Sequence, residues 1–192
     1  MFYNLQDLEK RAKNKNLTEA GAIYEFASIQ KSFNSTQNFD IFLSHSYLDA
    51  KYIKVIREDL MDLGYTVYVD WIVDKQLNRE NVTKETANTL RTRMKQCKSL
   101  FYAITENYSS SKWMPWELGY FDSLKNKVAI LPVKKLPDTS EQYKGTEYLG
   151  LYNYITVTND RSKHKVVWIN KNEHEYASFE EWIGGKEPYL RK

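Results

Sequence analysis

Hydrophobic positions change their spacing repeatedly along this chain from residue 39 onward. Short apolar runs of the kind that form buried strands alternate with stretches in which apolar residues recur every three or four positions, as on one face of a helix. The runs expected to form strands are residues 39–43, 65–69, 100–104 and 127–133, the last ended by Pro132 and Pro137. The segments expected to form helices are residues 48–63, 82–97 and a segment that contains Glu117 and ends near Leu124. This alternation predicts an α/β fold, with a parallel sheet covered by helices on both faces.

The chain on either side of this alternating part is less regular. Residues 3–32 contain two segments with helical spacing, and a polar connector follows them at residues 34–38. The two helices are too small to bury a core of their own, so we expect them to dock on the α/β part. After Val133 we expect a fifth strand at residues 152–157, an edge strand at 166–169 and a short final helix at 178–183.

Length and charge narrow the classes of function. A chain of 192 residues is long enough for one well-buried domain with an appendage. Its formal net charge of +3 is too small to indicate a nucleic-acid partner. The basic cluster at residues 10–15 is offset by Asp7, Glu9 and Glu19. We therefore expect a solvated helix face there and no binding of nucleic acid.

The sequence also bears on compartment and metals. No run approaches the ~18 apolar residues that a membrane span needs, and the first residues lack the pattern of a signal peptide. Cys97 is the single cysteine, so no intrachain disulfide forms and a reducing compartment is expected. It lies on the apolar face of a predicted helix, as a buried structural thiol does. The histidines have no partners at metal-ligand spacing. The sequence thus predicts a cytoplasmic protein that binds neither membrane nor metal.

Glu117 is the most informative single residue. It lies between two tryptophans and a Tyr-Phe pair, a short way after the predicted strand at residues 100–104. A carboxylate in aromatic surroundings is costly to bury unless it is paired, hydrogen-bonded or used. The order of strand, polar loop and helix puts Glu117 near the carboxyl edge of the sheet, where open α/β folds bind ligands.

The helix that carries Glu117 allows two interpretations. We expect Ser111 to cap it and Pro115 to fall in its first turn, where the missing N–H costs no bond. Trp113 and Glu117 are four positions apart and share a face. An aromatic ring beside a carboxylate suits a planar cationic leaving group such as nicotinamide, and the carboxylate can stabilise an oxocarbenium ion. Alternatively, Trp113 and Trp116 are core residues, and Glu117 merely favours the positive end of the helix. The residues alone leave both interpretations open.

The loop after the first strand carries hydroxyls and a histidine at residues 44–49. Two familiar phosphate-binding signatures, G-x-G-x-x-G and G-x-x-x-x-G-K-[ST], are absent. Ser46 or Asp49 is expected to cap the next helix, although the N–H groups and hydroxyls of the loop could also receive a phosphate or ribose. A Ser-His-Asp hydrolase triad within six residues is disfavoured, because triads are assembled across a fold and the nucleophile elbow is missing.

Three segments resemble, in order and spacing, the signature boxes of Toll/interleukin-1 receptor (TIR) domains. They are FDIFLSHS at residues 39–46, YTVYVDW at 65–71 and SKWMPWEL at 111–118. The chain is similar to bacterial TIR proteins, especially the stand-alone TIR sensors of Thoeris-type anti-phage defence. This resemblance implies a flavodoxin-like, doubly wound sheet of about five parallel strands. It also implies an enzyme that takes NAD+ as its substrate, needs no cofactor and releases nicotinamide together with ADP-ribose or a cyclised isomer.

The resemblance assigns roles position by position. Glu117 matches the catalytic glutamate of the family's W-x-x-x-E pattern, anchored here by Trp113. The loop from Asp70 to Asn81 contains the family's mobile loop, through which protomers contact one another. The positions implied to bind substrate are Ser44, His45, Asp70, Trp71, Arg91 and Trp113.

The resemblance also implies an organisation and a set of partners. An N-terminal helical extension is expected at residues 1–37, a TIR domain at 38–160 and a C-terminal strand and helix extension at 161–192. The implied partners are NAD+ and further copies of the chain, which associate through TIR surfaces. A downstream effector would be reached only through a diffusible nucleotide product, and a phage protein would be the trigger.

Two rival functions remain open. A non-catalytic TIR scaffold would act by self-association, but a scaffold has no need of a carboxylate at position 117. An enzyme like the nucleoside deoxyribosyltransferases would explain Glu117 but not the box at residues 39–46.

Overall fold

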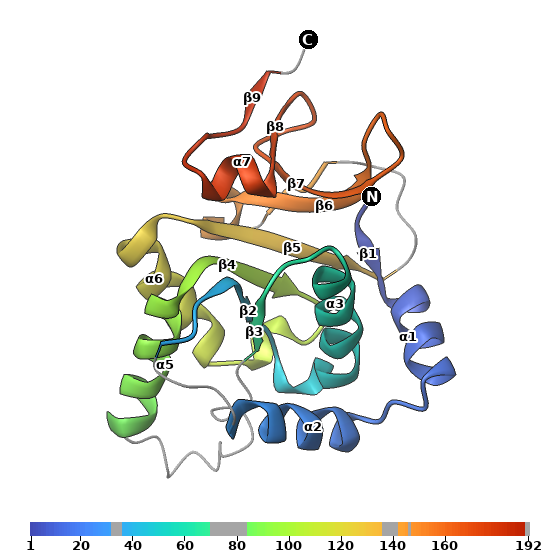
Figure 1. The fold of residues 1–192 in the computed structure, drawn as a ribbon, viewed down its shortest axis with the longest axis vertical. Helices are drawn as coiled ribbons and strands as arrows, with labels where there is room; N and C mark the ends of the chain where they lie inside the picture. The colour runs from blue at the N-terminus through green and yellow to red at the C-terminus, as the bar shows by residue number, and fades with distance from the viewer. Residues whose placement is uncertain (32–35, 70–83, 136–141, 146, 191–192) are drawn as a thin grey trace.

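The computed structural model describes residues 1–31, 36–69, 84–135, 142–145 and 147–190. A sheet runs through its centre (Figure 1). Five of its strands are parallel and lie in the order β3-β2-β4-β5-β6, which confirms the predicted flavodoxin-like arrangement. These strands are β2 (Phe39–Ser44), β3 (Val67–Val69), β4 (Cys97–Ile104), β5 (Val128–Lys134) and β6 (Asn153–Asn159).

Helices cover both faces of this sheet (Figure 1). One face carries α3, with α1 and α2 packed on α3, and the short helix α7. The opposite face carries α5 and α6. The helices are α1 (Leu5–Asn14), α2 (Glu19–Lys31), α3 (Ala50–Asp62), α5 (Lys84–Gln96), α6 (Trp113–Lys125) and α7 (Phe179–Ile183). Short 3-10 turns are η1 (Tyr47–Asp49), η2 (Tyr108–Ser110) and η3 (Glu147–Leu151).

The central strands are apolar on both sides because both sides are covered. Within β2, Ile41 and Leu43 belong to the core under α3, whereas Phe42 belongs to the core under α5 and α6. All three side chains are fully buried. Near-continuous apolar strands of this kind are what a parallel sheet with helices on both faces requires.

The N-terminal segment packs onto the sheet and onto α3. Strand β1 (Tyr3–Asn4) pairs in parallel with the carboxyl end of β5, and the Met1 carbonyl accepts a hydrogen bond of 3.0 Å from the Val157 N–H. In α1, Arg11 forms an ion pair with Asp59 of α3. The basic cluster at residues 10–15 is therefore tied partly to α3.

The C-terminal part extends the sheet in the antiparallel sense. Strands β7 (Lys165–Asn170), β8 (Glu175–Ser178) and β9 (Tyr189–Leu190) follow β6 in that order. The prediction of an edge strand at residues 166–169 was wrong, because β7 lies between β6 and β8. The pairing partner β8 was missed because its Glu-Tyr-Ala-Ser sequence has no long apolar run.

Two further sequence predictions were wrong in detail. Pro132 does not end a strand, because it lies inside β5 opposite Ile104. Its missing N–H is tolerated because Pro132 lies between two pairing regions of β5. The described pairs with β6 end at Ile130, and those with β1 begin at Val133. Cys97 is not helical but opens β4, although it is buried as expected and its thiol donates to the Arg93 carbonyl at 3.2 Å.

Neither a membrane span nor a metal site emerges from the part of the chain that the structure describes. No helix there is both long and apolar enough to cross a bilayer. Within the same residues, no group of three or more His, Cys, Asp and Glu side chains is placed to hold a metal ion.

Candidate active site

The connections of the parallel sheet diverge between β2 and β4. The chain leaves β2 through α3 toward β3 on one side, and it leaves β4 through α6 toward β5 on the other. Open α/β sheets bind their ligands at the carboxyl ends of the strands at such a switch point. Two loops meet there, residues 45–49 after β2 and residues 105–112 after β4.

Glu117 lies in α6, one turn beyond the start of that helix, and its side chain is buried, with 5% exposed. The hydroxyl of Ser44, the last residue of β2, donates a hydrogen bond of 2.6 Å to the Glu117 carboxylate. The structure therefore joins two of the predicted site residues directly, across the switch point. A buried carboxylate with a hydroxyl donor is the arrangement that makes burial of its charge tolerable.

The start of α6 follows the sequence expectation with one shift. The N-cap position is Lys112, which makes no side-chain cap bond. The Ser111 hydroxyl instead accepts a hydrogen bond of 3.4 Å from the Met114 N–H, and Pro115 lies in the first turn as expected. Because α6 begins at Trp113, Pro115 is its third residue, where the N–H that proline lacks would have no partner within the helix.

His45 follows Ser44 and is also buried. Its Nδ1 lies 3.2 Å from the carbonyl oxygen of Leu43. Burial lowers the pKa of His45 to about 4, and the Leu43 carbonyl offsets this only in part. The imidazole is therefore neutral at neutral pH, which excludes it as a permanent positive charge for phosphates.

Trp113, Trp116 and Tyr120 form a half-buried aromatic surface on α6. Trp113 meets Trp116 edge to face at 5.2 Å between ring centroids, and Trp116 stacks on Tyr120 at 5.6 Å. The guanidinium of Arg91, from α5, lies 5.4 Å from the Trp116 ring centroid and 5.9 Å from that of Tyr120. Its described contacts thus place Arg91 on the aromatic rings of α6, whereas Glu117 lies on the buried side of that helix. Asp70 and Trp71, also predicted for the site, lie outside the described residues.

Tyr102 is a neighbour of Glu117 that the sequence reasoning missed. It lies opposite Ser44 in the register of β2 and β4 and is buried. Burial raises the pKa of Tyr102, and the charges of Tyr148 and Glu117 act in the same direction. The sequence placed Tyr102 in a buried strand. Its hydroxyl, near the carboxyl end of that strand, was the one feature that could have indicated a place in the site.

Asp49 is a second residue whose partners the sequence did not reveal. The sequence left open whether Ser46 or Asp49 caps the next helix. In the structure the Ser46 hydroxyl caps the short turn η1, because it accepts a hydrogen bond of 3.4 Å from the Leu48 N–H. Asp49 occupies the N-cap position of α3 without a side-chain cap bond. Its carboxylate accepts hydrogen bonds from Thr105 at 2.6 Å and Asn107 at 2.8 Å, in the loop after β4.

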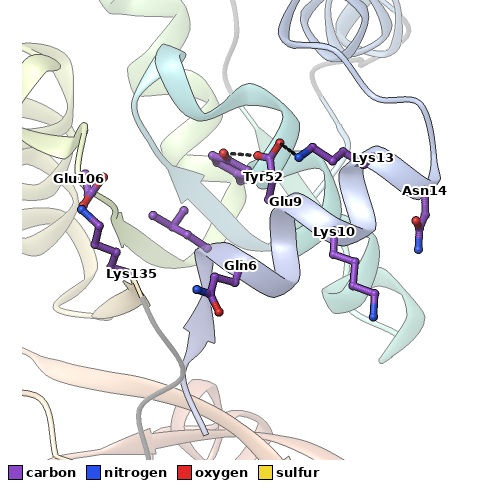
Figure 2. Close-up of a pocket in the computed structure, with 9 residues that line it drawn as sticks. Gln6, Glu9, Lys10, Lys13, Asn14, Tyr52, Glu106 and Lys135 are labelled. Atoms are coloured by element: carbon purple, nitrogen blue, oxygen red, sulfur yellow. Dashed lines mark hydrogen bonds and ion pairs between the residues drawn. The ribbon is translucent and has the colours of Figure 1, made fainter.

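A groove of about 620 Å³ lies elsewhere at this edge of the sheet. Figure 2 shows that α1 forms one side, with Tyr52 beside it and Glu106 and Lys135 across from it. Four of its charged side chains form two pairs, since Lys135 lies 2.9 Å from Glu106 and Lys13 lies 3.5 Å from Glu9. Neither Glu117 nor Ser44 lines it, so we separate this groove from the candidate active site.

Comparison with known proteins finds a family and relatives. Residues 41–175 match the profile of the TIR domain. A protein of Bacillus cereus (strain MSX-D12), named "Probable 3' cyclic ADP-D-ribose synthase ThsB'", is 52% identical over 156 residues, which cover 80% of this chain and 79% of that protein. A protein of Cytobacillus dafuensis, named "Putative cyclic ADP-D-ribose synthase TIR2", is 37% identical over 91 residues, 45% of this chain and 24% of that protein.

Proposed function

Because this chain belongs to the TIR-domain family, we propose that it is an enzyme that cleaves NAD+ at the nicotinamide–ribose bond. The products are nicotinamide and ADP-ribose in linear or cyclised form. The observation that carries this proposal is the buried Glu117 carboxylate at the switch point of the sheet, hydrogen-bonded to Ser44. The names of the two relatives support the same reaction class.

The chemistry asks for a negative charge beside the breaking bond. The bond between C1′ of the ribose and the pyridinium nitrogen breaks with its electron pair going to nitrogen, which leaves as neutral nicotinamide. Positive charge then develops on the ribose as an oxocarbenium ion, and a fixed carboxylate stabilises it. Water that attacks C1′ gives ADP-ribose and a proton, whereas a hydroxyl of the same molecule gives a cyclic isomer and a proton.

The remaining residues have supporting roles in this proposal. Ser44 holds the Glu117 carboxylate and lies where a ribose hydroxyl would approach it. Trp113, one turn before Glu117 on α6, offers a ring to the leaving nicotinamide. His45, Asp70, Trp71 and Arg91 complete the proposed substrate-binding set. No cofactor takes part.

The proposal extends to context. We place the protein in the cytoplasm, as a sensor in Thoeris-type anti-phage defence that a phage protein triggers. Copies of the chain associate through TIR surfaces, and a diffusible nucleotide product reaches the downstream effector. The division into residues 1–37, 38–160 and 161–192 belongs to the same proposal.

Two alternatives are distinguished by one assay. A TIR scaffold without catalysis is disfavoured by the buried carboxylate, and a deoxyribosyltransferase-like enzyme is disfavoured by the match to the TIR profile. Purified protein is incubated with NAD+, and nicotinamide and ADP-ribose isomers are separated by chromatography. Release of nicotinamide together with ADP-ribose, linear or cyclic, supports the proposal. A parallel incubation with a deoxynucleoside and a second free base, separated in the same way, shows base exchange if the protein is a transferase. Intact NAD+ at all protein concentrations, without base exchange, supports the scaffold.

A further inference from the structure

Resting on the proposed function, we propose that Asp49 is a positioning residue for Glu117. It does not touch the Glu117 carboxylate. It joins the loop after β2 to the loop after β4. The first loop directly follows Ser44 and the second directly precedes the helix of Glu117, and these are the two partners of the proposed catalytic hydrogen bond.

The junction is made by a buried, fully engaged carboxylate. Asp49 is 1% exposed, and its two oxygens accept from the Thr105 hydroxyl at 2.6 Å and the Asn107 amide at 2.8 Å. The Thr105 hydroxyl oxygen in turn accepts from the Asn107 N–H at 3.0 Å. Each end of the carboxylate thus fixes one residue of the loop that enters α6.

Further side-chain bonds join the same two segments. The hydroxyl oxygens of Ser46 and Ser110 lie 3.2 Å apart, and the Ser110 hydroxyl donates to the Asn107 carbonyl at 2.6 Å. The Ser46–Ser110 contact, like the bonds of Ser44 and Asp49, runs from residues 44–49 to residues 105–117, whereas the bond from Ser110 to Asn107 lies within the second segment. We call this set of contacts the switch-point clamp, and Asp49 makes two of its charge-assisted bonds.

A loosened clamp should act on the chemical step more than on binding. The Glu117 carboxylate must meet a charge that develops only in the transition state, and a displacement of about 1 Å can cost about 100-fold in rate. An interaction made only in the transition state lowers kcat and leaves KM nearly unchanged. Loss of fold would lower the apparent kcat in the same way, because it reduces the amount of active enzyme, so the test relies on a control variant and on a rescue.

The chain offers a control carboxylate near the start of β2. Asp40, near the start of β2, accepts hydrogen bonds from the Thr66 hydroxyl at 2.7 Å, from the Thr66 N–H at 2.9 Å and from Lys98 at 2.8 Å. It therefore makes comparable carboxylate bonds at the amino edge of the sheet, opposite to the edge where Glu117 lies. Asp40→Asn removes a similar set of interactions without touching the clamp.

A swap provides the rescue. In Asp49→Asn combined with Asn107→Asp, the new amide at 49 donates to the new carboxylate at 107, and its oxygen still accepts from Thr105. The two loops regain a charge-assisted bond with the donor and acceptor exchanged. Asp49→Asn alone removes the charge, so any bond between residues 49 and 107 needs a flip of one amide and is neutral, not charge-assisted.

The experiment compares wild type, Asp49→Asn, the swap and Asp40→Asn in steady-state NAD+ cleavage, below the melting temperature of all four. We expect Asp49→Asn to lower kcat about tenfold or more with KM within about twofold, Asp40→Asn to retain kcat, and the swap to recover most of the loss. Equal losses of kcat in Asp49→Asn and Asp40→Asn, a fall confined to KM, or a swap that recovers nothing would overturn the proposal.

Amide hydrogen exchange separates this inference from the proposed function. If wild type releases no nicotinamide, the proposed function fails, and exchange over residues 105–117 still decides on the clamp. Faster exchange there in Asp49→Asn, restored in the swap and absent in Asp40→Asn, supports it. Unchanged exchange in Asp49→Asn overturns it.

Discussion

At the scale of single residues, the proposed reaction depends on the charge of Glu117. Glu117→Gln keeps the size of the side chain and can still accept the hydrogen bond from Ser44, so the fold should be retained. The negative charge opposite the oxocarbenium ion is lost, and removal of such a fixed electrostatic group costs on the order of 100-fold or more in rate. Nicotinamide release measured beside a melting curve tests this. Near-wild-type turnover in the variant would show that another group carries the charge.

His45 leads to a prediction about stability and pH. Its pKa is about 4 in the folded protein and 6.5 as a free side chain, so between these values the unfolded chain binds a proton that the folded chain does not. Above pH 6.5 His45 is neutral in both states and does not change the free energy of unfolding. As the pH falls from 6.5 toward 4, protonation favours the unfolded chain, so the free energy of unfolding decreases. The slope is at most about 1.4 kcal/mol per pH unit.

The measurement is the free energy of unfolding from pH 7 to pH 4, for wild type and for His45→Asn. The variant should show a shallower fall over this window, once its constant loss of packing is subtracted. Parallel curves would mean that His45 has the same pKa in the folded protein as in the unfolded chain.

At the scale of elements, the two tryptophans of α6 should differ in their effect on catalysis. Trp113 is one turn from Glu117 on the same face, whereas Trp116 stacks on Tyr120 beneath Arg91. Both side chains are half-buried, so each Trp→Ala substitution should lower the free energy of unfolding by less than the ~3–5 kcal/mol typical of a fully buried site. Trp113→Ala should lower nicotinamide release, and Trp116→Ala should retain it at a similar melting temperature. Equal activity of the two variants would assign both rings to packing.

The elements also show how far a sequence pattern reaches. The apolar runs placed β2, β4 and β5 and the helices between them, because parallel strands buried on both faces need continuous apolar sequence. The register of the strands and the identity of the edge strands could not be predicted from apolar runs. The position of Pro132 inside β5 and the insertion of β7 between β6 and β8 depend on which strands pair, and that is decided by chain segments far away in the sequence.

The site was predictable to the same limited depth. Position and residue type pointed to Glu117, and the resemblance to TIR domains added Ser44, and the structure places the two side chains in contact. Asp49 looked like a helix cap because Asp is common there, and nothing local showed that Thr105 and Asn107 would take its oxygens instead. Contacts between loops arise only once the sheet order brings those loops together.

At the scale of the whole molecule, we predict that activity depends on protein concentration. In the resembling TIR enzymes, protomers contact one another through the loop that matches the segment ending at Asn81, which lies outside the described residues. If assembly completes the pocket, specific activity rises with concentration by mass action. Asp74→Lys in this segment should lower activity without changing the melting temperature.

The assay covers an approximately 100-fold range of concentration, with association followed in parallel by sedimentation. A flat specific activity with a high basal rate would show that one protomer holds a complete site.

The pairing of β1 with β5 has a consequence for how the chain is made. Residues 1–4 are translated well before their neighbours Val133, Lys134 and Val157. The first strand must therefore wait, unpaired, until most of the protein has been synthesised. Closing so long a stretch of chain is slow compared with pairing neighbouring strands, so the N-terminus joins the sheet as one of the last steps in folding. A nascent chain stalled before β5 would thus expose residues 1–4 to chaperones and proteases.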